Sequence, residues 1–152
     1  MRSVSALVPH PGGKMEPMTA TLTSTGSTAA VIVTHQRAEL LRASLEQVVH
    51  QTHPVQWVIV VDNGAENAVR ELVESMAGDR GVYVPSETNL GGAGGFALGF
   101  LTALSLGADA VWCADDDGRP ADNTVLAELY RVAEANRLHE VSPAVCLSLI
   151  HI

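Results

Sequence analysis

Three consecutive carboxylates, Asp115, Asp116 and Asp117, are the residues of this sequence that point most directly to chemistry. They follow an apolar run over residues 108–114 and precede Gly118. Adjacent negative charges repel one another, and a divalent cation offsets that repulsion. Mg²⁺ and Mn²⁺ prefer carboxylate oxygen and leave coordination positions open for phosphate. The triplet is therefore a candidate site for Mn²⁺ or Mg²⁺, with a solvated acidic loop as the alternative.

The apolar run before the triplet is typical of a strand that is buried on both faces. Cys113 lies within it and is expected to be a small core residue. Alternate side chains of an extended segment share one face. Asp115 and Asp117 can therefore converge on one metal ion while Asp116 points elsewhere.

A glycine-rich stretch, Asn-Leu-Gly-Gly-Ala-Gly-Gly at residues 89–95, leads into a helix that is predicted to start near Gly94. Glycines let a backbone approach a ligand closely, and a helix N-terminus offers free N–H groups to phosphate. The alternative is a flexible loop followed by a tightly packed helix. Five small residues at the start of an amphipathic helix favour the phosphate-binding interpretation.

Two further polar clusters follow predicted strands. Asp62 could accept a hydrogen bond from a nucleobase or a ribose, or it could close a strand-end turn that Asn63 and Gly64 also favour. Arg37 could pair with a base or a phosphate, or it could be a solvated residue of the following helix. Both alternatives stay open at this point.

Strands and helices alternate along the chain. The predicted strands cover residues 29–33, 57–61, 82–84 and 108–114, and the predicted helices cover residues 39–51, about 69–77, about 94–106 and about 125–132. Apolar strands alternating with helices predict an α/β fold, with a Rossmann-like, mostly parallel sheet and helices on both faces. Ligands bind beyond the carboxyl ends of such strands, where every polar cluster above is found.

Length and composition limit the function classes. A chain of 152 residues with 47% apolar residues is expected to form one domain, after a disordered leader over residues 1–28 that is rich in Pro, Gly, Ser and Thr. A net charge of −8 argues against nucleic acid as a partner. No stretch approaches the roughly 20 apolar residues of a membrane span.

Two nucleotide-binding functions compete, and a non-catalytic binding module is a third possibility. Residues 92–97 match the GxGxxA fingerprint of dinucleotide-dependent oxidoreductases, with an acidic residue about 20 positions further on. However, the glycines follow the third predicted strand rather than the first, and one ribose-binding acid does not explain three. A metal-dependent nucleotide-sugar transferase accounts for all four clusters, with the cation stabilising the departing nucleoside diphosphate.

The four clusters resemble the successive motifs of family 2 glycosyltransferases with the GT-A fold. The resemblance is carried by residues 31–37, 59–63, 89–96 and 115–118. Within that family, residues 89–99 (NLGGAGGFALG), 112–118 (WCADDDG) and 140–143 (EVSP) are most similar to the actinobacterial galactofuranosyltransferases that start cell-wall galactan. The resemblance extends from residue 29 to about residue 146.

The resemblance implies a UDP-galactofuranose donor, a divalent metal and inverting transfer to a polyprenyl-diphosphate-linked rhamnosyl-GlcNAc acceptor. It also implies a cytoplasmic protein with peripheral contact at the inner face of the membrane. By motif position, Thr34, Arg37 and Asp62 would hold the uridine. Asp116 would lie on the ribose side, and Asp115 with Asp117 would hold the metal. The predicted nucleotide-sugar-binding residues are Thr34, Arg37, Asp62, Asn89, Gly91, Gly92, Gly94 and Asp116, and the predicted metal ligands are Asp115 and Asp117.

Members of the family carry their general base further along the chain. Here the carboxylates after the triplet, Asp122, Glu128, Glu134 and Glu140, fit helix caps or solvated positions, so no catalytic base is identified. Residues 147–152 (LSLIHI) match the translation of a transposon-end adaptor. We therefore expect a nucleotide-sugar-binding part over residues 29–146, a GT-A fold truncated at its C-terminus, and a non-native tail over residues 147–152.

Overall fold

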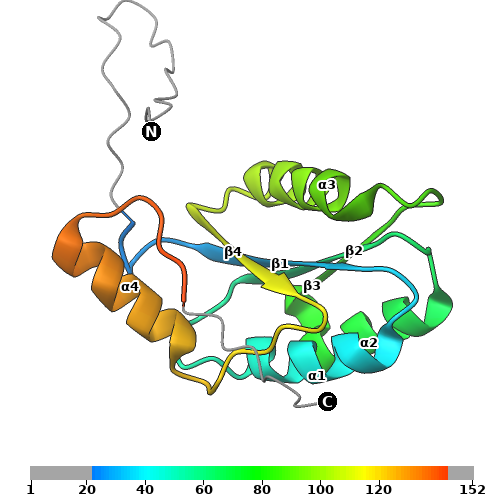
Figure 1. Ribbon diagram of the computed structural model, residues 1–152, viewed down its shortest axis with the longest axis horizontal. Coiled ribbons are helices and arrows are strands. Elements are labelled where there is room, and N and C mark those ends of the chain that lie inside the picture. The colour runs from blue at the N-terminus through cyan, green and yellow to red at the C-terminus, as the bar shows by residue number, and fades with distance from the viewer. Residues whose placement is uncertain (1–21, 144–152) are drawn as a thin grey trace, which may run out of the picture.

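The computed structural model describes residues 22–143 (Figure 1). Its elements are β1 (Thr28–Thr34), α1 (Ala38–Val49), β2 (Trp57–Asp62), α2 (Asn67–Ala77), the 3₁₀ turn η1 (Gly78–Arg80), β3 (Gly81–Pro85), α3 (Gly91–Ser105), β4 (Ala110–Asp115) and α4 (Val125–Asn136). Thr28, which we assigned to the leader, is buried and is the first residue of β1. The predicted tail and residues 1–21 of the predicted leader lie outside the described residues.

The four strands form one parallel sheet in the order β3-β2-β1-β4. The predicted α/β architecture is therefore confirmed. In the register of the sheet, Thr34 of β1 pairs with Asp62 of β2, and Val33 pairs with Asp115 of β4. The carboxyl ends of the three strands thus meet at one edge. After β3 the chain crosses to the far side of β1, which makes the β1/β4 junction the topological switch point where α/β folds bind ligands.

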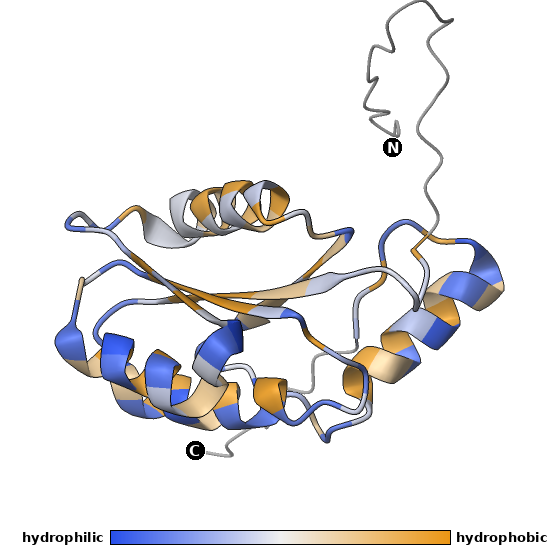
Figure 2. Cartoon of the chain, turned by 180° about the vertical axis from the view of Figure 1, so that it is seen from behind, coloured by the Kyte–Doolittle hydropathy of each residue, from blue (hydrophilic) through white to orange (hydrophobic). Residues whose placement is uncertain are grey.

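Helices cover both faces of the sheet, as predicted. One face of β1 and β2, including Ile32 and Val60, packs against α1, α2 and α4. The opposite face, including Val31 and Val61, packs against α3. Successive strand residues point to opposite faces, so a strand with both faces covered is apolar throughout. Figure 2 shows this as largely apolar strands between the two helical layers.

Helix α3 approaches the sheet unusually closely because glycines face β1. A Cβ atom at Gly95 would lie 2.5 Å from Val33 Cγ1, and one at Gly99 would lie 2.3 Å from Val31 Cγ1. Real Cβ atoms do not come that near to a neighbour. The helix begins at Gly91, three residues before the predicted start, so Gly92 and Gly94 belong to its first turns rather than to a loop.

The prediction that β4 is buried on both faces is wrong. β4 lies at the edge of the described sheet, and one side of it is exposed while the other is partly buried or, at Ala114, buried. Cys113, expected in the core, is exposed, and 36% of the Val111 surface is accessible. An apolar run alone does not distinguish an edge strand from a central one. Within residues 22–143, no helix is long and apolar enough to span a bilayer.

Candidate nucleotide and metal site

Thr34 and Asp116 form the buried floor of the site at the β1/β4 switch point. Thr34 is the last residue of β1, and Asp116 directly follows β4. The Thr34 hydroxyl donates a hydrogen bond of 2.9 Å to Asp116 Oδ2. Thr34 is 2% exposed and Asp116 7% exposed. A buried carboxylate is stable only with such partners, so this bond joins the ends of the two strands.

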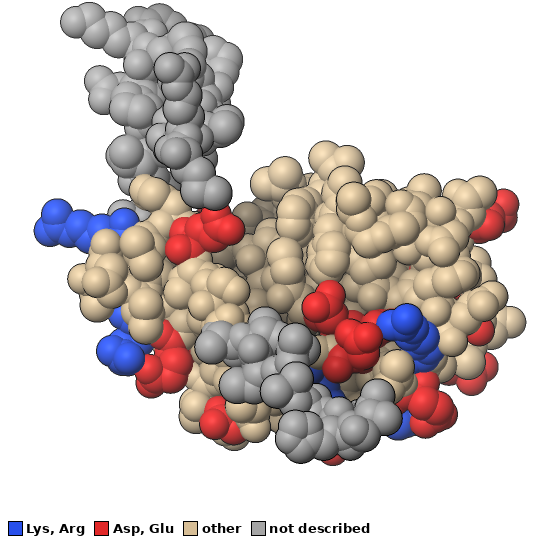
Figure 3. Space-filling view, viewed as in Figure 1, with Lys and Arg blue, Asp and Glu red and all other residues tan. Residues whose placement is uncertain are grey.

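Arg37 lies over this floor and contacts two of the three carboxylates. Its Nη1 atom is 3.1 Å from Asp117 Oδ2 and 3.5 Å from Asp116 Oδ1. The chain reaches this position through a tight turn in which Gln36 has φ = 55°, and α1 starts immediately after Arg37. Figure 3 shows acidic and basic side chains side by side at the carboxyl end of β4.

Ser44 fixes the acidic segment from the α1 side. It is fully buried, and its hydroxyl donates a hydrogen bond of 2.8 Å to the Asp115 carbonyl oxygen. Ser44 is absent from the predicted site, because a serine inside an amphipathic helix carries no sign of its distant partner. With the backbone anchored, Asp115 and Asp117 are exposed while Asp116 turns inward. This is the alternation that an extended segment produces.

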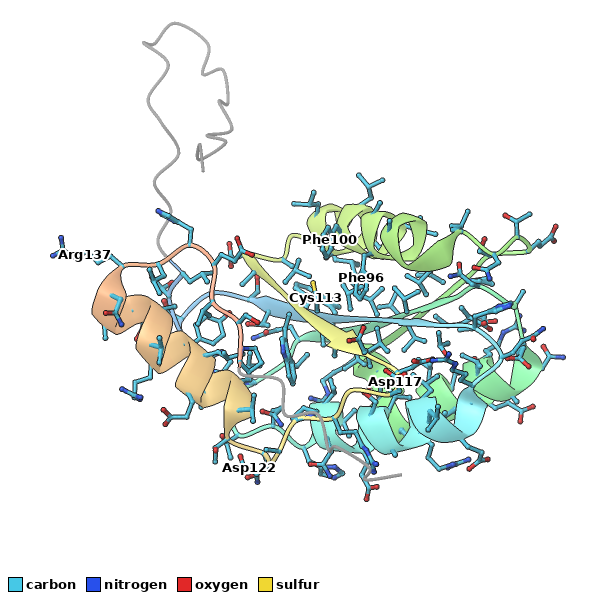
Figure 4. The ribbon with its side chains drawn as sticks, in the orientation of Figure 1. Phe96, Phe100, Cys113, Asp117, Asp122 and Arg137 are labelled. Atoms are coloured by element: carbon cyan, nitrogen blue, oxygen red, sulfur yellow. The ribbon has the colours of Figure 1, made fainter. Side chains whose placement is uncertain are left out.

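The exposed carboxylates fit a hard divalent cation. Among residues 22–143, no three His, Cys, Asp or Glu side chains come together as a complete metal-binding group. Mg²⁺ commonly takes only one or two carboxylates from a protein and fills its other positions with water and substrate phosphates. Asp115 and Asp117 are the candidates for such a donor pair by residue type and exposure, since the Asp116 carboxylate is buried and bound by Thr34. Asp117 lies beyond the end of β4 (Figure 4).

Asp62 is in a different situation from the triplet. It is fully buried, and its carboxylate accepts hydrogen bonds from Gly64 N at 2.9 Å, Glu66 N at 2.6 Å and the Tyr83 hydroxyl at 2.9 Å. Burial, together with the hydrogen bond to Asp62, raises the pKa of Tyr83 to about 12. In this structure Asp62 closes the turn after β2, which is the alternative that the sequence left open.

Asn63 connects that turn to the glycine-rich stretch, and it is a second residue missing from the predicted site. Its Oδ1 accepts from Leu90 N, and its Nδ2 donates to the Gly91 carbonyl oxygen, both at 3.3 Å. Asn89 Oδ1 accepts a 2.8 Å hydrogen bond from Gly91 N. The side chain of Asn63 therefore holds the start of α3 beside the end of β2. Its position directly after Asp62 was the available signal.

The predicted glycines differ in what surrounds them. Gly91 has φ = +67°, a conformation that favours glycine. Gly92 is exposed, and a Cβ atom there would meet nothing within 4 Å. A Cβ atom at Gly94 would lie 2.8 Å from Cβ of Leu90, the residue that precedes α3. Gly91 and Gly92 thus both leave the backbone open to solvent at the N-terminus of α3, and only Gly92 does so without a positive φ.

The structure therefore brings some of the predicted residues together and keeps others apart. Thr34, Arg37, Asp116 and Asp117 form one connected cluster. The predicted residues Asn89, Gly91, Gly92 and Gly94 form a second group at the start of α3, linked to β2 through Asn63. A cavity of about 270 Å³ lies elsewhere, between the first residues of β4 and α4, and none of the predicted site residues lines it.

Three of the carboxylates that follow the triplet, Asp122, Glu128 and Glu134, have structural partners, and Glu134 Oε1 accepts a hydrogen bond of 2.5 Å from Ser24 N. Asp122 accepts hydrogen bonds from the Thr124 backbone and hydroxyl, which lower the pKa of Asp122, and Thr124 is the residue that precedes α4. Glu128 pairs with Arg131 at 2.7 Å. Figure 4 shows Asp122 well removed from Asp117. These contacts support helix starts and surfaces rather than proton transfer.

Comparison with known proteins places this chain in a family. The glycosyl transferase family 2 model matches residues 29–145. The chain is 54% identical over 125 residues to galactofuranosyltransferase GlfT1 of Mycolicibacterium smegmatis, covering 82% of this chain and 41% of that protein. It is 52% identical over 124 residues to galactofuranosyltransferase GlfT1 of Mycobacterium tuberculosis, covering 80% of this chain and 40% of that protein. The chain thus spans about two-fifths of the length of these relatives.

Solved structures show the same fold at low sequence identity. TarS 1–349 of S. aureus in complex with UDP superposes with a TM-score of 0.58 at 18% identity, covering 72% of this chain and 32% of that one. The mannosyltransferase PcManGT of Pyrobaculum calidifontis, in complex with GDP-Man and Mn²⁺, superposes with a TM-score of 0.56 at 20% identity, covering 78% of this chain and 34% of that one. These neighbours support the GT-A fold. Since the family model covers most of the chain, including the switch-point cluster, the chain belongs to glycosyl transferase family 2.

Proposed function

We propose that this chain is the donor-binding part of a galactofuranosyltransferase. The whole enzyme would transfer galactofuranose from UDP-galactofuranose to a polyprenyl-diphosphate-linked rhamnosyl-GlcNAc acceptor, with inversion. The observation that carries the proposal is the cluster of Thr34, Arg37, Asp116 and Asp117, inside a segment that is 54% identical to a GlfT1 galactofuranosyltransferase. We assign the whole enzyme to the cytoplasmic side of the membrane, in peripheral contact with it.

Different residues of this chain would bind different parts of the nucleotide-sugar donor. Asp115 and Asp117 would hold Mn²⁺ or Mg²⁺, which supplies positive charge to the diphosphate when bound. Thr34 keeps Asp116 oriented at the floor, and Arg37 contributes a guanidinium beside it. At the start of α3, residues 92–94 would present backbone N–H groups to a phosphate, since the Gly91 N–H is already bound by Asn89. Asp62, being buried, would position the turn after β2 rather than touch the uridine.

Attack by the acceptor hydroxyl requires a carboxylate that removes its proton. The carboxylates on α4 and at its start are engaged elsewhere, as described above. The proposal therefore gives this chain donor binding, and it gives proton removal to the part of the full-length relatives that the chain does not span. It follows that these 152 residues should bind the nucleotide but transfer no sugar.

A dinucleotide-dependent oxidoreductase, the other function that the sequence left open, receives no support from the fold. Its fingerprint glycines form the tight turn between the first strand and the first helix. Here the matching glycines lie inside α3, which follows β3, and Gly95 and Gly99 are used for packing on β1.

A thermal-shift experiment separates the two functions. The chain should melt at a higher temperature with UDP and Mn²⁺ than with UDP and EDTA, because a ligand that binds only the folded state stabilises it. NADH should give no such shift. Stabilisation by NADH and not by UDP with Mn²⁺ would overturn the proposal. In a parallel assay with UDP-galactofuranose and acceptor, any sugar transfer by this chain alone would show that it already contains a base.

A further inference from the structure

Arg37 is the cation that the structure places on the acidic triplet. Its Nη1 atom contacts Asp117 Oδ2 and Asp116 Oδ1, at 3.1 and 3.5 Å. We propose that Arg37 is an exchangeable counter-ion: it neutralises Asp116 and Asp117 in the metal-free chain and leaves Asp117 when a divalent cation enters. This inference rests on the proposed function, since it takes Asp117 as a metal ligand.

The two contacts of Arg37 are of different kinds. The Asp116 side chain is 9% exposed and has a second partner in Thr34, so it remains satisfied if the guanidinium moves. The Asp117 side chain is 57% exposed, and within the described part of the chain Arg37 is the one residue that pairs with it. An exposed ion pair contributes little stability, because water screens it and both side chains lose freedom. The Arg37–Asp117 pair is therefore the contact that exchanges readily.

A metal ion and Arg37 cannot share Asp117 without cost. The guanidinium is within hydrogen-bond distance of Asp117 Oδ2, so a metal ion on either oxygen of this carboxylate would lie only a few ångströms from it and the two cations would repel. The Arg37 side chain can turn away from Asp117 into solvent, because it is 53% exposed. It lies between the turn at Gln36 and the start of α1. Arginine is also well suited to phosphate, which would arrive together with the metal.

Exchange predicts that removing the guanidinium strengthens metal binding. In the 152-residue chain, Arg37→Met should bind Mn²⁺ about 5- to 20-fold more tightly than wild type in the absence of nucleotide, as measured by calorimetry. Arg37→Lys keeps the charge and should stay within about twofold of wild type. Arg131→Met removes the same charge from the Arg131–Glu128 pair on α4 and should leave Mn²⁺ affinity unchanged.

Thermal unfolding supplies a second measurement that does not depend on activity. The metal-free Arg37→Met chain should melt at a lower temperature than wild type. Saturating Mn²⁺ should raise the melting temperature of Arg37→Met by more than it raises that of wild type. If the ion pair were merely structural, its loss in Arg37→Met would lower the melting temperature without increasing the affinity for Mn²⁺. Equal or weaker Mn²⁺ binding by folded Arg37→Met, while wild type binds Mn²⁺, overturns the exchange alone. Failure of wild type and variants alike to bind Mn²⁺ overturns the metal assignment and the exchange together.

Discussion

Asp62 and Asp116 are buried carboxylates at the ends of the two strands that flank β1, but their partners differ. Asp62 accepts two hydrogen bonds from the backbone of its own turn and one from Tyr83. Asp116 accepts one from Thr34 and contacts the guanidinium of the exposed Arg37 side chain. Asp62 is thus held by partners in its own turn and in β3, whereas one partner of Asp116, the exposed Arg37 guanidinium, can move away.

Tyr83→Phe tests the structural role of Asp62. The variant removes one donor to a buried carboxylate and should lower the free energy of unfolding by about 1–3 kcal/mol at pH 8. Because the pKa of Tyr83 is raised from 10.0 to about 12 in the folded chain, its contribution is complete below pH 10 and is lost as the pH rises from 10 to 12. Urea denaturation should show the gap between wild type and variant closing over that interval. A constant gap would contradict the Tyr83–Asp62 bond.

Asp117→Asn tests the metal ligand directly. The variant should fold, and relief of repulsion within the triplet offsets part of the lost contact with Arg37. Mn²⁺-dependent UDP binding should fall by more than about 100-fold, which corresponds to about 3 kcal/mol. Calorimetry checks this, with Asp79→Asn on the exposed η1 turn as the matched control. An unchanged Mn²⁺-dependent affinity for UDP would remove Asp117 from the metal site.

At the scale of elements, the close fit of α3 on β1 depends on glycine. Gly99→Ala should destabilise the chain by about 1–3 kcal/mol, because its methyl group would fall 2.3 Å from a Val31 methyl in the core. Gly92→Ala lies on the same helix with open space around it, and should be neutral or stabilising by up to about 1 kcal/mol. Chemical denaturation of both variants measures the difference. Equal stabilities would show that α3 can move off the sheet without cost.

Gly92 also tests the phosphate-binding role of the α3 N-terminus. Gly92→Val places a β-branched side chain where the backbone is open, so the protein should fold while UDP binding weakens by about tenfold. Gly92→Ala, with a smaller side chain, should have an intermediate affinity. A folded Gly92→Val chain with normal affinity for UDP in the presence of Mn²⁺ would leave the glycines with a packing role alone.

The order and type of these elements could be predicted from the sequence, because apolar periodicity is a local property. The edge position of β4 could not, since it depends on which strands pair. The Tyr83 partner of Asp62 was also hidden, because it lies 21 residues away along the chain. The glycines had two possible roles, and the structure divides them: Gly95 and Gly99 pack on the sheet, while Gly92 stays open.

At the scale of the whole molecule, the described chain is a parallel sheet between two helical layers with its polar chemistry at one edge. α3 carries no charged residue, and its outward side chains include Leu101 and Leu104, 65% and 67% exposed. The upper part of Figure 3, over α3, is correspondingly almost free of charged side chains. Exposed apolar surface of this kind favours contact with further protein or with a second copy. Binding experiments on the chain are therefore best made at low protein concentration.

Titration of UDP into the 152-residue chain, by calorimetry with Mn²⁺ and again with EDTA, tests the central claim most directly. The switch-point cluster and the exposed pair Asp115 and Asp117 predict saturable one-to-one binding that requires Mn²⁺. GDP should bind more weakly under the same conditions if the donor is a UDP-sugar. Absence of UDP binding by the folded chain in Mn²⁺, or binding of equal affinity in EDTA, would contradict a metal-dependent nucleotide-sugar site at the carboxyl ends of β1 and β4.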